Sequence, residues 1–370
     1  MPDILVGGHI CLDLIPGMAQ VTRTALTTPG HLSETGPMIV STGGAVSNVG
    51  LALWRLGVDV GLMANVGDDA IGDMIVGYLR QRDERLARSV RRCAGQASSY
   101  TVVLSPQNSD RMFLHCPGAN DRFGADDIDW TQAAGASIFH FGYPPLMARM
   151  REDEGRELAE LFRRARAAGL VTSLDMALPD PATASGRAPW AAILANVLPY
   201  VDVFVPSIEE ILFMQRRADF ERWRGAVTAY LTPVYLRALA AELLDLGAVV
   251  AGFKLGEQGM YVRVSGDDAQ LTRLAALPIN LPDWCNAEVY QPAFDVQVVG
   301  TTGAGDSAYA GLLAAMRRGY APVAALRWAC AVGACNVEQA DSNSGIRPWE
   351  EIQARLDKGW LTRAGLIAAI

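Results

Sequence analysis

The stretch GTTGAGDSAYAGLLAAM, residues 300–316, indicates a glycine-rich turn that leads directly into a helix. Its small residues let the backbone turn tightly, and the helix that follows presents unpaired N–H groups and the positive end of its dipole. Phosphate oxygens bind at such helix starts. Asp306, in the first turn of this helix, could accept a proton from a hydroxyl group held beside a phosphate. The alternative is an ordinary turn in which Asp306 only stabilises the helix start.

A second segment of small residues, STGGAVSNVG at residues 41–50, opens another predicted helix. The adjacent glycines Gly43 and Gly44 permit close approach of the backbone to a ligand, and Asn48 offers donor and acceptor atoms to sugar hydroxyls. A predicted strand then leads to the turn GDDAIG at residues 67–72. Without a ligand, the two glycines form a loop and Asn48 is a surface polar residue.

Between these motifs, short apolar runs alternate with longer stretches of helical period, which predicts a mostly parallel sheet covered by helices. The predicted strands cover residues 4–8, 60–66, 137–141, 170–175, 201–205 and 248–255. The predicted helices cover residues 46–55, 70–82, 152–168, 233–246, 304–317 and 321–339. We therefore expect a single doubly wound α/β domain over residues 1–370.

Some segments do not follow this alternation. Residues 12–40 and 98–120 contain β-rich runs and turn residues, and we expect them to form a small β-rich lid over one edge of the main sheet. Residues 216–232 and 282–295 resemble surface insertions. The chain contains no internal repeat and no low-complexity tract.

The composition excludes several classes of function. A formal net charge of −8 and a pI of about 5.1 argue against a nucleic-acid partner, which requires a basic face. The six cysteines form no CxxC pair, so we expect free thiols in a reducing compartment. No run reaches the roughly 18 apolar residues of a membrane span, and the N-terminal residues lack the charge pattern of a secretory signal. We expect a cytoplasmic protein with no membrane partner.

Taken together, the motifs resemble the two signatures of the ribokinase-like (PfkB-type) carbohydrate kinase family. The resemblance rests on the order of three segments: Gly-Gly-x-x-x-Asn at residues 43–48, the turn at residues 67–72, and Thr-x-Gly-Ala-Gly-Asp at residues 301–306. Further matches fall along nearly the whole chain, at Asp13, residues 117–120, Glu210 and residues 254–259. The resemblance implies a ribokinase-like fold and ATP-dependent phosphorylation of a hydroxyl on a sugar-like molecule, with Mg²⁺.

The same resemblance implies roles for individual residues. The residues implied to bind the acceptor hydroxyls are Asp13, Gly43, Gly44 and Asn48. The implied anion hole consists of Gly303, Ala304 and Gly305, with Asp306 as the base. The implied nucleotide contacts are Lys254, Gly256, Gly259, Ser207 and Thr301, and Glu210 would organise Mg²⁺ through water. Without the resemblance, Asp13 is a turn acid and Lys254 a solvated lysine. Cys330 and Asn336 either flank the adenine or belong to a helix core.

The sequence departs from the family pattern at two positions. Gly300 stands where the family usually has Asp, in a stretch that helps to form a monovalent-cation site in related kinases, so we expect potassium activation to be weak or absent. Ser207 replaces the Asn of an Asn-x-x-Glu segment but leaves Glu210 in place.

Several alternatives remain at this point. No Gly-x-x-x-x-Gly-Lys-Ser/Thr motif is present, which excludes a P-loop kinase. The first predicted strand is not followed by Gly-x-Gly-x-x-Gly, which disfavours a nicotinamide-dependent dehydrogenase. A nucleoside kinase of the same fold and a non-catalytic sugar or nucleotide sensor stay open, as does a homodimer through the lid. The sequence does not identify the acceptor.

Overall fold

A nine-stranded sheet forms the centre of the described molecule, which comprises residues 2–107 and 112–365 of a computed structural model. The strand order is β13-β12-β11-β10-β9-β8-β1-β4-β5. Neighbouring strands run parallel except at one edge, where β12 is antiparallel to both β11 and β13. The strand bounds are β1 Ile4–Gly8, β4 Val60–Gly67, β5 Val90–Cys93, β8 Ile138–Gly142, β9 Val171–Asp175, β10 Val203–Phe204, β11 Val250–Lys254, β12 Met260–Val264 and β13 Glu288–Gln291. The doubly wound, mostly parallel sheet expected from the sequence is confirmed.

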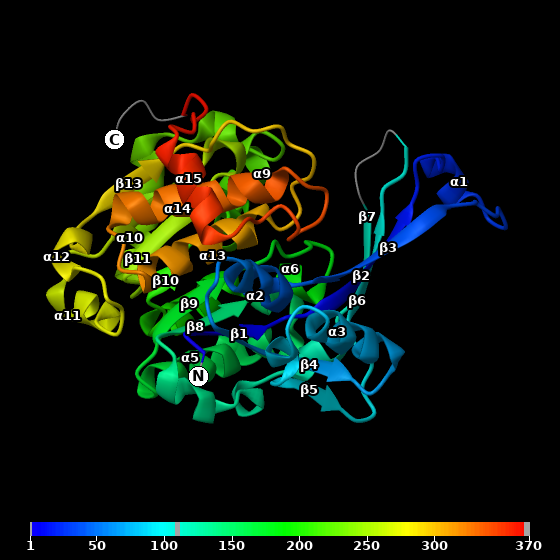
Figure 1. The fold of residues 1–370 in the computed structure, drawn as a ribbon, viewed down its shortest axis with the longest axis horizontal. Helices are drawn as coiled ribbons and strands as arrows, with labels where there is room; N and C mark the ends of the chain where they lie inside the picture. The colour runs from blue at the N-terminus through cyan, green and yellow to red at the C-terminus, as the bar shows by residue number, and fades with distance from the viewer. Residues whose placement is uncertain (1, 108–111, 366–370) are drawn as a thin grey trace.

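Helices cover both faces of this sheet (Figure 1). The first face carries α2 Ala45–Arg55, α3 Ala70–Arg80, α13 Ala304–Arg317 and α14 Pro322–Val337. The second face carries α5 Arg156–Ala167, α7 Trp190–Val197, α8 Ile208–Gln215 and α10 Pro233–Asp245. The remaining α-helices are α1 Arg23–Thr27, α4 Ala148–Arg151, α6 Ala184–Arg187, α9 Arg217–Arg222, α11 Asp268–Leu271, α12 Leu281–Trp284 and α15 Trp349–Asp357.

Each face of the sheet has its own hydrophobic core. Successive side chains of a strand point to opposite faces, so in β1 Leu5 packs into the second-face core and Val6 into the first-face core. The first-face core also buries Leu312 and Leu313, which fixes α13 against the sheet. None of the helices within the described residues is both long and apolar enough to cross a membrane.

Two segments expected to be surface insertions pack against the body. Residues 282–295 supply the edge strand β13 and bury Trp284 completely, at 0% exposure. Residues 216–232 form α9 and bury Trp223 in the second-face core. The edge strands β5 and β13, and β12 beside β13, were not among the predicted strands, because such short segments give little periodic signal.

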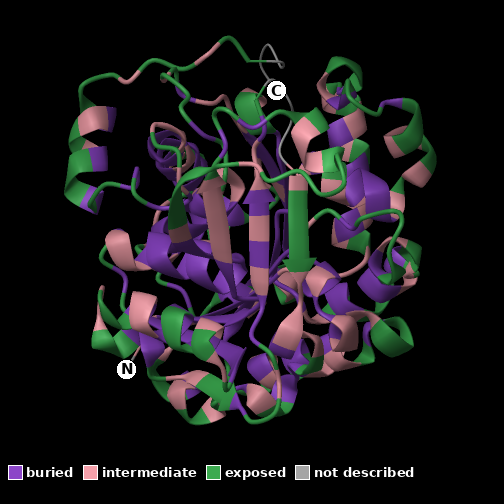
Figure 2. Ribbon diagram, turned by 90° about the vertical axis from the view of Figure 1, so that its right-hand side faces the viewer, coloured by how far each residue is buried: buried purple, intermediate pink, exposed green. Residues whose placement is uncertain are grey.

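A second sheet, here called the small sheet, projects from the body (Figure 1). Its strand order is β3-β2-β6-β7, with bounds β3 Gly36–Gly43, β2 Cys11–Gly17, β6 Tyr100–Leu104 and β7 Met112–Cys116. The four strands lie largely within the two regions expected to form the lid, although β2 begins at Cys11 and β3 continues to Gly43. Residues 108–111 lie outside the described residues. Figure 2 faces this sheet, whose strands are more exposed than the buried strands of the main sheet.

Candidate active site

The turn before α13 leaves space only for glycine. Gly303 has a φ of +74°, and a Cβ there would lie 2.7 Å from Cβ of Ser342, so any other residue would be strained. At Gly305 a Cβ would lie 3.3 Å from Cδ of Lys254. The first-turn N–H groups of α13 have no carbonyl partner within the helix, and together with the helix dipole they favour an anion. The predicted anion hole of Gly303, Ala304 and Gly305 therefore lies at the N-terminus of α13, where the Ala304 N–H donates to the Thr301 carbonyl at 3.2 Å.

Asp306 lies in the first turn of α13 and is only 4% exposed. The Tyr143 hydroxyl lies 2.8 Å from Oδ1 and 2.7 Å from Oδ2 of Asp306, and Asn48 Nδ2 donates to Oδ2 at 2.9 Å. Burial raises the pKa of Asp306, whereas the Lys254 ammonium and these two hydrogen-bond donors lower it, and the net direction is upward. Asp306 is therefore a carboxylate oriented by two hydrogen-bond donors, and its raised pKa makes it a stronger base than an exposed aspartate.

A buried ion pair lies beside this carboxylate. Nζ of Lys254, at the end of β11, donates to both oxygens of Asp175, at the end of β9, over 2.6 and 2.7 Å. Burial raises the pKa of Asp175, which is 0% exposed. Burial disfavours the ammonium of Lys254, but Asp175, Glu210 and Asp306 outweigh this effect and raise the pKa of Lys254. The carboxyl ends of parallel strands meet at one edge of a sheet, which explains why these side chains converge.

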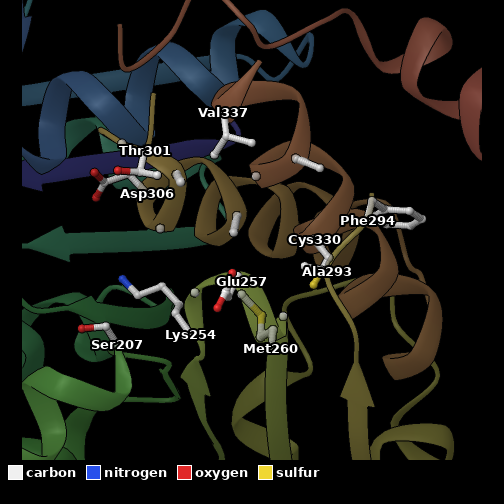
Figure 3. Close-up of a pocket in the computed structure, with 18 of the residues that line it drawn as sticks. Ser207, Lys254, Glu257, Met260, Ala293, Phe294, Thr301, Asp306, Cys330 and Val337 are labelled. Atoms are coloured by element: carbon white, nitrogen blue, oxygen red, sulfur yellow. The ribbon is translucent and has the colours of Figure 1, made fainter. Parts of the chain in front are cut away.

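A cavity of about 430 Å³ extends from Asp306 along α13 and α14 (Figure 3). Lys254 points toward the end that holds Asp306 and Thr301, whereas Met260, Phe294 and Cys330 surround the opposite, apolar end. All the residues predicted from the sequence for the nucleotide, the anion hole and the metal line this one cavity: Ser207, Glu210, Lys254, Gly256, Gly259, Thr301, Gly303, Ala304, Gly305 and Asp306.

Asn336 does not line the cavity. Its side chain is fully buried, donates to the Thr302 carbonyl at 2.8 Å and accepts from the Ser307 hydroxyl at 3.1 Å. Asn336 therefore braces the turn before α13, which agrees with the helix-core alternative for this residue. Cys330, in contrast, is 7% exposed and lines the apolar end of the cavity.

Glu210 faces the cavity from the start of α8, where Ser207 is the N-cap residue. Its Oε2 accepts a hydrogen bond from the Ser207 backbone N–H at 2.7 Å. In the part of the chain that the structure describes, no cluster of three or more His, Cys, Asp or Glu residues could hold a metal ion. Mg²⁺ is usually held by one or two carboxylates together with substrate phosphates and water, so Glu210 and a bound polyphosphate would suffice.

The residues predicted to bind the acceptor lie near the junction of the small sheet and α2. A Cβ on Gly43 would lie 2.2 Å from Oδ2 of Asp13. Gly44 has a φ of +83°, and a Cβ there would lie 2.5 Å from Nδ1 of His9. Burial raises the pKa of Asp13 to about 6. Asn48 connects this region to Asp306, and its Oδ1 is buried without a hydrogen-bond partner among the described residues. An unpaired buried acceptor of this kind is suited to a ligand hydroxyl.

Sequence reasoning missed Tyr143, Asp175 and His9. His9 lies 1% exposed after β1, and its Nε2 is 3.3 Å from Nε2 of His115 on the small sheet. Asp175 could have been identified from the sequence, because an acid at the carboxyl end of a predicted parallel strand often lies at a ligand site. Tyr143 belongs to no motif, and only the folded chain brings it to Asp306.

Gly300 has no room for the side chain that the family pattern would place there. A Cβ would lie 2.9 Å from Cα and the carbonyl oxygen of Ala340 and from the carbonyl oxygen of Gln339. The loop before α13 packs so closely against residues 339–340 that only glycine fits at position 300, where the family pattern has Asp.

Comparison with known proteins finds sugar kinases among the proteins similar to this chain. A probable fructokinase-2 of Arabidopsis thaliana is 26% identical over 175 residues, which is 47% of this chain and 50% of that protein. A 2-dehydro-3-deoxygluconokinase of Thermoproteus tenax is 25% identical over 346 residues, which is 90% of this chain and 93% of that protein. The chain spans only 50% to 61% of the length of five plant fructokinases that it matches.

The fold has counterparts among solved structures. The ribokinase of Arabidopsis thaliana, solved with ribose and ATP, superposes with a TM-score of 0.73 at 18% identity, over 96% of this chain and 98% of that chain. At this identity the likeness shows the fold alone. The sequence itself matches the pfkB family carbohydrate kinase description over residues 1–349. The chain therefore belongs to the pfkB family of carbohydrate kinases.

Proposed function

We propose that the protein transfers the γ-phosphoryl group of ATP to a hydroxyl group of a sugar or a sugar-like small molecule. One observation carries the proposal: the buried carboxylate of Asp306 lies in the first turn of α13, between Asn48 on the acceptor side and Lys254 on the cavity side. A pure binding protein would have no need of an oriented base at a helix N-terminus. This is our reason for preferring a kinase to a sugar or nucleotide sensor.

The cavity of about 430 Å³ is of a size usual for small-molecule sites, and its lining suits a nucleoside triphosphate. Its apolar end suits a base, and its other end combines the start of α13 with the ammonium of Lys254, both of which favour phosphate oxygens. The Gly303–Gly305 backbone would hold the transferring group. Mg²⁺, once bound through Glu210 and the phosphates, would neutralise part of the phosphate charge. We expect no strong dependence on potassium, because Gly300 leaves no space for the carboxylate of the family pattern.

The chemistry at Asp306 is a proton transfer coupled to displacement at phosphorus. The acceptor hydroxyl gives its proton to the Asp306 carboxylate, and its oxygen bonds to the γ-phosphorus. The bond from that phosphorus to the bridging oxygen breaks, and ADP leaves with the electron pair. The products are the phosphorylated acceptor, ADP and a protonated Asp306. Asp13, Gly43, Gly44 and Asn48 would hold the remaining hydroxyls of the acceptor.

Only the comparison with known proteins indicates which class of acceptor to expect. The relatives are named fructokinases and a 2-dehydro-3-deoxygluconokinase, and the solved ribokinase contains ribose. A nucleoside acceptor is the second candidate.

We also propose that the small sheet closes over the acceptor as a lid. Phe113 and Leu114, at 60% and 59% exposure, could support a homodimer there. Six free thiols favour a reducing, cytoplasmic location.

The proposal is tested by measuring ADP release over pentoses, hexoses, 2-keto-3-deoxy sugar acids and nucleosides, and by the variant Asp306→Asn. Asn keeps the size of Asp but cannot accept the proton, so turnover should fall by roughly 10²- to 10⁴-fold. Affinity for ATP, measured by calorimetry, should change little because the backbone N–H groups remain. Asp219→Asn, which changes an aspartate on α9 that does not line the cavity, is the control. Turnover of Asp306→Asn within a few-fold of the parent would contradict the assignment.

A further inference from the structure

Tyr143 has an unusual backbone conformation for its residue type. It directly follows β8 with φ 66° and ψ 40°, in the left-handed region that bulky residues rarely adopt, and Pro144 and Pro145 come next in the chain. A backbone hydrogen bond from Tyr143 N–H to the Asp175 carbonyl, at 3.2 Å, holds the turn. Strained residues of this kind persist where the surrounding structure holds them in place, and they gather at functional sites.

The strained turn directs the Tyr143 hydroxyl at Asp306. The hydroxyl oxygen lies within 2.8 Å of both carboxylate oxygens, and Asn48 Nδ2 also donates to Oδ2, at 2.9 Å. The Tyr143 O–H donates its one proton at the edge of the carboxylate shared by Oδ1 and Oδ2, and Asn48 uses one further acceptor site of Oδ2. An acceptor hydroxyl that approaches along this edge must displace or share the Tyr143 hydrogen bond before its proton can move to Asp306.

We propose that Tyr143 is a positioning residue that occupies Asp306 until an acceptor arrives, so that the enzyme phosphorylates its acceptor in preference to water. The inference rests on the proposed kinase function and goes beyond it by naming the residue that suppresses hydrolysis of ATP. Water is small and binds weakly, so it competes poorly with the phenol, whereas a sugar held by several further contacts competes well.

The reaction that Tyr143 suppresses differs from phosphoryl transfer only in the nucleophile. A water molecule would give one proton to Asp306, its oxygen would bond to the γ-phosphorus, and the bond to the ADP oxygen would break. The products would be inorganic phosphate and ADP. A water molecule admitted to Asp306 is thus the only additional reactant that this hydrolysis requires.

Removing the phenolic hydroxyl also changes the titration of Asp306. The charged groups that face Asp306 are Lys254 from β11, Glu210 from α8 and Asp175 from β9, and its hydrogen-bond donors are Tyr143 and Asn48. Tyr143 and Asn48 lower the pKa of Asp306 by stabilising its charged form, as does Lys254, and Glu210 raises it. Without the Tyr143 hydroxyl the pKa of Asp306 rises. A base acts only when deprotonated, so the acid limb of the rate profile moves to higher pH.

The test compares Tyr143→Phe with Tyr235→Phe. Tyr235 makes an equivalent hydrogen bond to Asp219 at 2.7 Å outside the site, so its variant controls for the loss of a tyrosine–aspartate contact. We expect Tyr143→Phe to raise the ratio of acceptor-independent ADP release to acceptor phosphorylation by about tenfold, the effect of one hydrogen bond to a charged group. We also expect its acid limb to move upward in pH. An unchanged ratio and an unchanged acid limb would overturn the inference.

A second measurement does not depend on turnover. Without nucleotide, a water-soluble carbodiimide and an amine are used to label Asp306, and mass spectrometry follows the rate. Labelling requires an accessible, protonated carboxyl, so it should be several-fold faster in Tyr143→Phe than in the parent and in Tyr235→Phe. Equal labelling rates would overturn the role of Tyr143 even if no acceptor were found. A parent that releases no ADP with any acceptor, but shows faster labelling in the variant, would instead contradict the kinase proposal alone.

Discussion

Replacing Lys254 with methionine removes the cation that faces the fully buried carboxylate of Asp175. The ammonium lies 2.6 and 2.7 Å from the two Asp175 oxygens, and the Asp175 side chain is 0% exposed. The carboxylate keeps the hydrogen bond from Met176 N–H at 2.8 Å. Removing one partner of a buried ion pair costs about 3–5 kcal/mol, because the remaining charge stays in a medium of low dielectric.

The cost translates into a measurable change in melting temperature. The entropy of unfolding is about 2.1 cal/mol/K per residue, which gives about 0.8 kcal/mol/K for a chain of this length. We therefore expect Lys254→Met to lower the Tm by about 4–6 °C near pH 8.

The loss should shrink as the pH falls. Lys254 lowers the pKa of Asp175, so in Lys254→Met this pKa rises further above its value in the unfolded chain. Between the two pKa values the folded variant binds more protons than the unfolded chain. Its stability is therefore greatest at low pH and falls as the pH rises, by up to about 1.4 kcal/mol per pH unit.

Thermal unfolding followed by circular dichroism, repeated from about pH 5 to about pH 8, measures both effects. The double variant Asp175→Asn with Lys254→Met should recover most of the loss, because an amide replaces the unpaired charge and still accepts from Met176 N–H. Arg80→Met, which breaks an exposed ion pair with Glu84, is the control and should cost less than about 1 kcal/mol. The reasoning is refuted if Lys254→Met melts with the parent, or if the double variant loses as much as the two single variants together.

Further predictions concern turnover. ADP release should require a divalent metal, because Glu210 and the cavity residues supply too little positive charge for a triphosphate; equal turnover in excess chelator would contradict this. Exchange of sodium for potassium at constant ionic strength should change turnover by less than about tenfold, since Gly300 has no side chain. Gly43→Ala should raise the KM for the acceptor and not for ATP, because its Cβ would lie 2.2 Å from Oδ2 of Asp13; an unchanged acceptor KM would be evidence against this contact. Burial raises the pKa of Asp13 to about 6, so acceptor affinity should fall as the pH drops below that value, and Asp13→Asn should abolish this dependence.

The sequence alone predicted the sheet and the helix start that carry the candidate site. Glycines at residues 303 and 305 and the acid at residue 306 form a local pattern, and the apolar runs that make parallel strands are local as well. Local patterns are readable because they depend on backbone geometry within a few residues. The same is true of the two regions that supply the small sheet.

Only the tertiary structure decided which side chains meet at Asp306. Tyr143 is separated from Asp306 by 163 residues and belongs to no motif. The family resemblance implied that Asn48 and Asp306, 258 residues apart, share a site, but it did not indicate that Asn48 donates directly to the Asp306 carboxylate. The pairing of Lys254 with Asp175 likewise follows from the convergence of β9 and β11. Hydrogen bonds and ion pairs act over a few ångströms in space, whereas sequence motifs record only neighbours along the chain. The electrostatic environment of Asp306 is therefore a property of the folded chain.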